Sequence, residues 1–270
     1  MHSGAVQSVR CASARCGPVP CEAVRAHCTS TVGTVEVTST QRRVRARIGT
    51  WPYRPDVAHL VLLDHQMVPS DADVRSWIDA ARRGGAVAIR TGALFPNSVG
   101  SFLAAGFERI DELALLERPL AGYGRRPREQ RVRPLRRGQL DAAVRIDVRA
   151  FGPTWGNDRA ALSDIMHATP FAHARSITVG RNTVGFAMSG VAGEVGYLQR
   201  LAVDPTRQRH GAGAQLVDDS LAWMLRRGAT TAMVNTASDN DAALALYDAF
   251  GFHRRTDTLV LLELRLDTMS

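Results

Sequence analysis

The chain has 270 residues, of which 45% are hydrophobic, so it can form one large domain or two small ones. Its net charge is +8, and every basic residue apart from histidine is an arginine. The arginines are spread along the chain rather than gathered with aromatic residues, which argues against a nucleic-acid partner. No apolar run approaches the roughly 20 residues of a membrane span, and no secretory signal is visible, so we expect a soluble cytoplasmic protein without membrane contact.

Residues 1–32 are rich in Ser, Ala, Cys and Arg and lack periodicity, so we expect a disordered leader. The four cysteines of the chain all lie in this leader, at Cys11, Cys16, Cys21 and Cys28. Their spacing is not C-x-x-C, and His27 is one of only two imidazoles nearby. A zinc site is the alternative that these residues leave open, but we expect no metal.

Residues 33–120 alternate between strand and helix patterns, which predicts a small α/β domain. Alternating apolar residues from Val35 to Ile48 predict a hairpin. Ser70 or Asp71 is expected to cap an amphipathic helix that ends at Gly84-Gly85. We also expect strands over residues 59–64, 86–89 and 110–116, and a second helix over residues 98–105.

Residues 121–130 are basic and contain glycine and proline, so they are interpreted as a linker to a second domain at residues 131–270. This domain is predicted to open with a strand and an amphipathic helix. The expected order is a strand at 132–135, a helix at 139–150, a loop at 151–157, a short helix around 162–166 and a hairpin at 176–188.

The stretch from Tyr197 to Leu225 predicts a strand, a glycine-bearing turn and a helix. Alternation would put Tyr197, Gln199, Leu201 and Val203 on one face of the strand, and Leu198, Arg200 and Ala202 on the other. Pro205 ends the strand because it lacks an amide N–H. The turn Gln208–Gly213 then presents free N–H groups at the positive end of a helix dipole, which predicts an anion site.

Three motifs occur in order: Val-x-Pro at residues 203–205, Q-x-x-G-x-G at 208–213, and N-x-x-A-x-x-L-Y-x-x-x-G-F at 240–252. Together they resemble the GCN5-related N-acetyltransferase family over roughly residues 131–266. The resemblance implies a mixed, mostly antiparallel sheet flanked by helices. It also implies direct transfer of an acetyl group from acetyl-CoA to a primary amine, which could be a protein N-terminus, a lysine or a small metabolite.

The resemblance also implies roles for individual residues. Cofactor contacts are expected at Leu201, Ala202, Val203, Gln208, Arg209, His210, Gly211, Ala212, Gly213, Ala214 and Asn240. Tyr247 matches the family's general acid, since a phenol of pKa about 10 can protonate the departing thiolate. The alternatives are a core role for Tyr247 and an N-cap role for Asn240. No general base is identified, although Glu194 could act through water.

The first domain resembles a copy of the second. Phe102–Arg109 aligns with Tyr247–Arg254, and a leucine-rich strand follows both. Because the first copy lacks the glycine turn and has Phe102 in place of Tyr247, we interpret residues 33–120 as a degenerate acetyltransferase-like domain. This arrangement is similar to the tandem mycothiol synthases.

Two functions are therefore weighed. The first is an acetyl-CoA-dependent N-acetyltransferase, acting as a monomer or homodimer, with an acceptor pocket formed by residues 151–157, 176–188 and 256–260. The second is a non-catalytic acyl-CoA-binding regulatory or assembly module, which the missing base would favour. A retained Tyr247 favours the enzyme.

Overall fold

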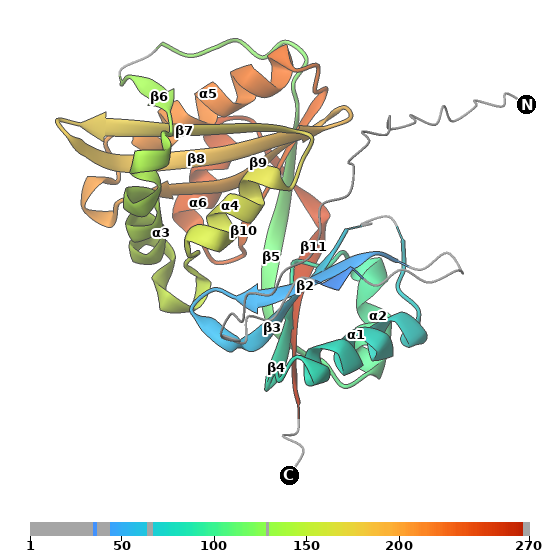
Figure 1. The fold of residues 1–270 in the computed structure, drawn as a ribbon. Coiled ribbons are helices and arrows are strands. Elements are labelled where there is room, and N and C mark those ends of the chain that lie inside the picture. The colour runs from blue at the N-terminus through green and yellow to red at the C-terminus, as the bar shows by residue number, and fades with distance from the viewer. Residues whose placement is uncertain (1–34, 37–43, 64–66, 128–129, 267–270) are drawn as a thin grey trace, which may run out of the picture. The chain divides into compact units, whose positions relative to one another are not determined.

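The computed structural model describes residues 35–36, 44–63, 67–127 and 130–266 (Figure 1). The predicted leader with its four cysteines, and the centre of the first predicted hairpin, lie outside these residues. We call the described residues up to 120 the N-terminal half and residues 130–266 the C-terminal half. No helix in the described ranges is both long and apolar enough to cross a membrane.

Among the described residues, eleven strands form one mixed sheet in the order β1-β2-β3-β4-β11-β5-β10-β9-β8-β7-β6. Their bounds are β1 (Val35–Glu36), β2 (Ala46–Trp51), β3 (Arg54–Leu62), β4 (Ala88–Thr91), β5 (Glu108–Pro119), β6 (Val132–Pro134), β7 (Phe171–Val179), β8 (Asn182–Ala192), β9 (Val195–Val203), β10 (Thr231–Ala237) and β11 (His253–Arg265). Within the described sheet only β3–β4 and β9–β10 are parallel. The expectation of a mixed, mostly antiparallel sheet is confirmed.

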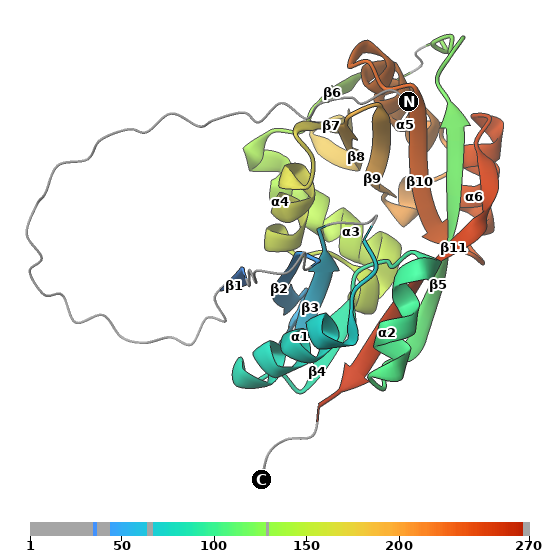
Figure 2. The ribbon, with the colours of Figure 1, turned by 90° about the vertical axis from the view of Figure 1, so that its right-hand side faces the viewer.

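The last strand of each half pairs with strands of the other half. β11 lies between β4 and β5, and β5 lies between β11 and β10. β5 and β11 also pair with each other antiparallel, from His253 opposite Glu117 to Glu263 opposite Glu108. Figure 2 shows these two long strands side by side at the junction of the halves. The sheet of each half therefore contains a strand that comes from the other half.

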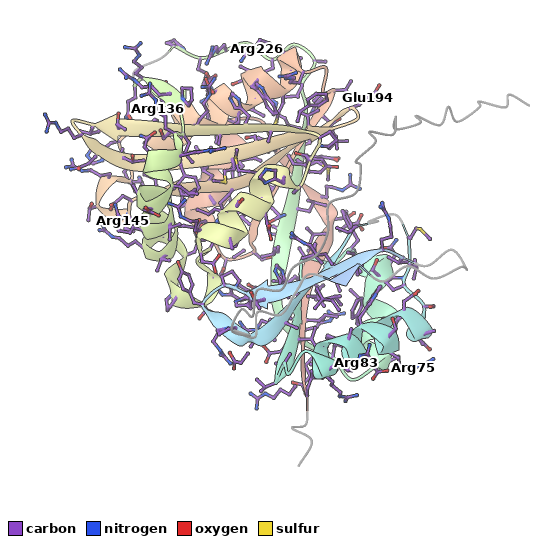
Figure 3. The ribbon with its side chains drawn as sticks, viewed as in Figure 1. Arg75, Arg83, Arg136, Arg145, Glu194 and Arg226 are labelled. Atoms are coloured by element: carbon purple, nitrogen blue, oxygen red, sulfur yellow. The ribbon has the colours of Figure 1, made fainter. Side chains whose placement is uncertain are left out.

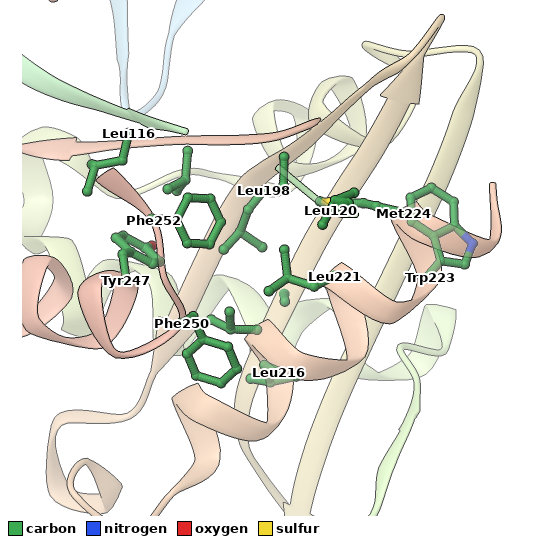
Figure 4. Close-up of a cluster of buried hydrophobic side chains, with 14 of the residues drawn as sticks. Leu116, Leu120, Leu198, Leu216, Leu221, Trp223, Met224, Tyr247, Phe250 and Phe252 are labelled. Carbon is green, nitrogen blue, oxygen red and sulfur yellow. The ribbon is translucent and has the colours of Figure 1, made fainter. Parts of the chain in front are cut away.

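In the part of the chain that the structure describes, six α-helices cover the sheet: α1 (Asp71–Arg83), α2 (Val99–Ala104), α3 (Leu140–Trp155), α4 (Arg159–His167), α5 (Ala212–Arg226) and α6 (Asp241–Ala249). In the C-terminal half, α3 and α4 pack on one face of β8, over a core with Phe186 and Met188. The other face carries α5 and α6, which bury Leu216, Met224 and Phe250 (Figure 4). Full burial of such a side chain contributes about 1.5–3 kcal/mol.

The helix signals of the sequence are confirmed where they are local. Ser70 caps α1: its hydroxyl accepts from the Asp73 N–H, and the Asp73 carboxylate accepts from the Ser70 N–H. Asn240 caps α6 by accepting from the Ala243 N–H at 3.1 Å. These caps satisfy amide groups that a helix N-terminus otherwise leaves unpaired.

The predicted loop at residues 151–157 is wrong in its first part, because α3 continues to Trp155. The helix is kinked at Gly152, whose backbone has φ 74° and ψ 174°, and it resumes with Pro153 in the second segment. Proline suits the first turn of a helix, where its missing N–H has no partner to lose. The loop proper is short and leads into α4, which is capped by Asp158.

The predicted linker packs closely against α5. The Tyr123 hydroxyl donates to Asp218 at 2.6 Å, and the Arg126 N–H donates to the same carboxylate at 2.8 Å. Arg125 donates to Asp219 at 2.8 Å, and both aspartates are almost fully buried. Because buried carboxylates need such partners, this segment is part of the folded structure of the C-terminal half.

Candidate active site

A wedge opens in the sheet where β9 and β10 separate. The two strands pair in parallel from Val195 opposite Thr231 to Leu198 opposite Val234. Beyond that point β10 continues along β5, and β9 continues along β8. The edge of β9 that faced β10 therefore has no strand partner over Leu201–Val203, which leaves backbone groups available to a ligand.

A β-bulge at Gln199 marks the start of the wedge. Met188 pairs with Arg200 while the next residue of β8 pairs with Leu198, so Gln199 has no opposite residue. A bulge reverses the side-chain alternation of a strand. The predicted face is therefore wrong for Leu198, which joins Leu201 and Val203 in the core beneath α5. Arg200 and Ala202 share the other face, as predicted, and face α3.

The turn at residues 208–213 has the conformation expected of an anion site. Arg209 and Gly211 both have positive φ, at 64° and 78°. Gly211 is the N-cap of α5 and supplies no side-chain cap, so the first N–H groups of α5 are not capped by a side chain. The side chains of Gln208, Arg209 and His210 are exposed. This geometry is suited to a phosphate group.

Gly213, Ala212 and Ala214 are small residues at the start of α5. A Cβ at Gly213 would lie 3.4 Å from a methyl group of Leu246, which is an ordinary van der Waals contact between α5 and α6. Ala212 is buried, and Ala214 is partly buried against the same core.

Tyr247 points into the core between α6 and the sheet. Its ring contacts Phe252 edge to face, with 5.7 Å between centroids, and only 4% of the residue is exposed (Figure 4). Burial raises the pKa of Tyr247, and the positive charge of Arg200 opposes this shift weakly. The hydroxyl therefore stays protonated at neutral pH and can act as a proton donor.

Arg200 and Asp147 form a buried pair that the sequence did not indicate as a site. Arg200 donates from Nε and Nη2 to the two oxygens of Asp147, both at 2.7 Å, and the carboxylate is fully buried. The guanidinium also lies 3.5 Å from the centre of the Phe151 ring. A signal was present, because Asp147 lies on the apolar face of its helix with Ala143 and Ala150, and a carboxylate there needs a cationic partner.

Glu194, the residue that could act as a base through water, lies away from the turn Gln208–Gly213. Glu194 is exposed in the turn before β9 (Figure 3), at the other end of β9 from the turn Gln208–Gly213. His253 is exposed at the start of β11.

The labelled arginines of Figure 3 are distributed over both halves, with Arg75 and Arg83 on α1 and Arg145 on α3.

The N-terminal half has no comparable turn at its corresponding helix. The first N–H groups of α1 face the capping box of Ser70 and Asp73, and Asp71 adds a second negative charge. Negative charge at this helix end disfavours an anionic ligand. Phe102 is fully buried and stacks on Trp77 with 6.1 Å between ring centroids.

Comparison with known proteins gives concordant results. Residues 140–252 match the model of the Acetyltransferase (GNAT) family. The chain is 30% identical over 117 residues to the [ribosomal protein bS18]-alanine N-acetyltransferase of Escherichia coli K12, covering 43% of this chain and 76% of that protein. It is 29% identical over 218 residues to the mycothiol acetyltransferase of Streptomyces coelicolor, covering 76% of this chain and 70% of that protein.

Solved structures show the same fold over both halves. A tandem GNAT protein from the clavulanic acid biosynthesis pathway superposes with a TM-score of 0.61 and 14% identity, covering 84% of this chain and 80% of the other. A GCN5-related N-acetyltransferase from Kribbella flavida gives a TM-score of 0.59 and 16% identity, covering 85% and 89%.

Proposed function

The chain belongs to the acetyltransferase (GNAT) family and is an acetyl-CoA-dependent N-acetyltransferase; on that premise, we propose that acetyl transfer takes place in the wedge between β9 and β10. The observation that carries this proposal is that the N-terminus of α5, which no side chain caps, follows directly after the part of β9 that has separated from β10. One ligand can then bind the turn with its phosphates and the strand edge with its thioester.

In this proposal the pyrophosphate of CoA accepts hydrogen bonds from the N–H groups of the turn Gln208–Gly213. Arg207 and Arg209, which are exposed beside the turn, add positive charge. The thioester carbonyl accepts from a backbone N–H of Leu201–Val203 on the open edge of β9. Asn240 would contact the CoA arm in addition to capping α6. These contacts hold the thioester carbon at a fixed point of the wedge.

The reaction then needs one nucleophile and one proton donor. The neutral amine attacks the thioester carbon, the carbon–sulfur bond breaks, and the CoA thiolate takes a proton from the Tyr247 hydroxyl. The backbone N–H on the carbonyl oxygen stabilises the charge that develops there. The amine nitrogen loses its extra proton to water, and water restores the proton of Tyr247.

We propose an α-amine as the acceptor, because none of the carboxylates described at the wedge is a free base. Asp147, the buried one, is held by Arg200. The amine must therefore arrive neutral. An α-amine has a pKa near 7.7–8.0 and a lysine near 10.4, so at pH 7.5 the neutral fraction of the α-amine is roughly 200 to 300 times larger.

The name of the first relative agrees with an α-amine acceptor on a protein. The name of the second relative is compatible with a small metabolite as the acceptor. One relative acetylates an alanine of a ribosomal protein, and the other is a mycothiol acetyltransferase. The buried side-chain oxygen of Gln199 has no hydrogen-bond partner among the described residues and lies at the opening of the wedge. It would accept a hydrogen bond from the incoming amine and so orient it.

We also propose that the protein works in the cytoplasm, where acetyl-CoA is available, as a monomer or homodimer. The N-terminal half would be a degenerate acetyltransferase-like copy without a cofactor of its own. Its capped and acidic helix start supports this interpretation.

Titration calorimetry with acetyl-CoA, followed by release of free CoA thiol, tests the function. The acceptors are a peptide with a free N-terminal alanine, the same peptide with a blocked N-terminus and an internal lysine, and a small primary amine. Release that is fastest with a free α-amine supports the proposal. Release that is fastest with lysine would exclude the argument from the neutral fraction. Binding without release from any amine would favour a non-catalytic acyl-CoA-binding module.

A further inference from the structure

The segment from Phe151 to Asn157 lies beside the wedge and has a tightly defined backbone. Arg200 donates to the Trp155 carbonyl at 2.9 Å, and Asp147 accepts from the Asn157 N–H at 2.6 Å. A Cβ at Gly156 would lie 2.8 Å from the Gly152 carbonyl oxygen, so this position has room for glycine alone. The buried Arg200–Asp147 pair thus connects the wedge directly to this segment.

The same segment is also held from the N-terminal half, by the turn between β2 and β3. Trp51 donates from its indole N–H to the Thr154 carbonyl at 3.2 Å, and its ring meets the Trp155 ring edge to face at 5.7 Å. The Tyr53 hydroxyl donates to the Asn157 carbonyl at 3.3 Å. Figures 1 and 2 both show the β2–β3 hairpin beside the connection between α3 and α4.

Trp51 is a buried aromatic residue, and Tyr53 is a half-exposed residue with an unfavourable backbone conformation. Trp51 is 8% exposed and is itself held by Arg90, whose guanidinium lies 5.1 Å from the indole centre. Tyr53 is half exposed and has a positive φ of 59°, a conformation that is unfavourable for a bulky residue. Strain of this kind persists where the surrounding structure requires it, and it clusters at functional sites.

We propose that Trp51 and Tyr53 are positioning residues for acetyl transfer, which fix residues 151–157 and, through them, Arg200 at the acceptor side of the wedge. This inference rests on the proposed function of the wedge. It gives the N-terminal half a role in the reaction although that half has no phosphate-type turn of its own. The acceptor site is then incomplete without the β2–β3 hairpin, and the substrate amine meets residues from both halves.

The test uses the full chain with Trp51→Phe, which removes the indole N–H but keeps a ring, and Tyr53→Phe, which removes only the hydroxyl. Trp77→Phe is the matched control, because Trp77 is buried in the same half and stacks on Phe102 in a core cluster that contains no residue of the segment. Hydrogen exchange of the amides at 151–157 is measured first, since it needs no acceptor. Loss of one hydrogen bond should speed their exchange about 2- to 10-fold in both variants and leave it unchanged in the control.

The kinetic part compares two acceptors with acetyl-CoA: the alanine peptide, and hydroxylamine, which is small enough to need no acceptor site and whose uncatalysed reaction with the thioester is subtracted. Both variants should raise the KM for the peptide about 2- to 10-fold and leave the acetyl-CoA Kd and the rate with hydroxylamine unchanged. Equal losses with both acceptors, or unchanged exchange at 151–157, would overturn the inference. If the wild-type chain acetylates neither acceptor, the proposed function fails, and the exchange measurement still decides whether the hairpin positions the segment.

Discussion

Gly211 provides the sharpest test of the phosphate site, because strain and charge can be separated there. Its φ of 78° is left-handed, so an L-residue at this position costs roughly 1–2 kcal/mol, less for Asn or Asp. The Asn side chain of Gly211→Asn has nearly the same shape as the Asp side chain of Gly211→Asp but carries no charge. Gly228 has a φ of 84° just after the other end of α5, so Gly228→Asp carries the same backbone cost away from the turn.

The expected size of the charge effect follows from Coulomb's law. Two unit charges 5 Å apart interact by about 3 kcal/mol at an effective dielectric constant of 20. If the pyrophosphate lies on the turn, Gly211→Asp should weaken acetyl-CoA binding roughly 100-fold relative to Gly211→Asn. The difference should shrink as salt is added, because the turn is exposed to solvent.

Titration calorimetry of acetyl-CoA at two salt concentrations measures the effect, and denaturant unfolding measures the strain. Gly228→Asp should lose stability but bind acetyl-CoA like the wild type. Equal affinities for Gly211→Asp and Gly211→Asn would refute the assignment of the turn. Equal losses of affinity for the Asp variants at 211 and 228 would attribute the effect to strain alone.

Three further predictions concern the acid, the buried pair and the shared sheet. Tyr247→Phe should lower kcat about 10²- to 10⁴-fold with the acetyl-CoA Kd unchanged. Because burial keeps the pKa of Tyr247 above its ordinary value of 10, the wild-type rate should not fall through deprotonation of this acid below pH 10. A fall in rate near pH 8 that is absent in Tyr247→Phe would contradict the buried position of the hydroxyl. Asp147→Asn should cost about 3–5 kcal/mol in denaturant unfolding, because Arg200 is left buried without its carboxylate; a loss under about 1 kcal/mol would show the pair to be solvated. Residues 131–270 expressed alone should not unfold cooperatively or bind acetyl-CoA, because β10 and β11 lack β5 between them; an isolated segment with the full-length affinity would show that β5 is dispensable.

The features that the sequence predicted well depend on neighbours in the chain. The helix α1 with its Ser70 cap and the helix α6 with its Asn240 cap follow from apolar periodicity and from residues within one turn. The glycine turn before α5 follows from Gly211, since few other residues adopt its conformation readily. The motifs at these places were sufficient to indicate the family.

The features that the sequence missed depend on residues far apart. The bulge at Gln199 arises from the pairing of β9 with β8, and it puts Leu198 on the face opposite to the predicted one. The extension of α3 beyond residue 150 depends on the kink at Gly152, which the glycine and proline had suggested was a loop. Arg200 and Asp147 are 53 residues apart, so neither identifies the other in the sequence.

By itself, the sequence determined the local elements, the glycine turn before α5 and the family, because caps, periodicity and glycine conformations act over a few residues. Only the tertiary structure decided how the halves are joined. β5 and β11 exchange between the sheets, and Trp51 and Tyr53 reach residues more than 100 positions away. The pairing of β11 with β4 and with β5 puts the β2–β3 hairpin and the C-terminal half in one sheet. No pattern of nearby residues predicts contacts between residues so far apart in the chain.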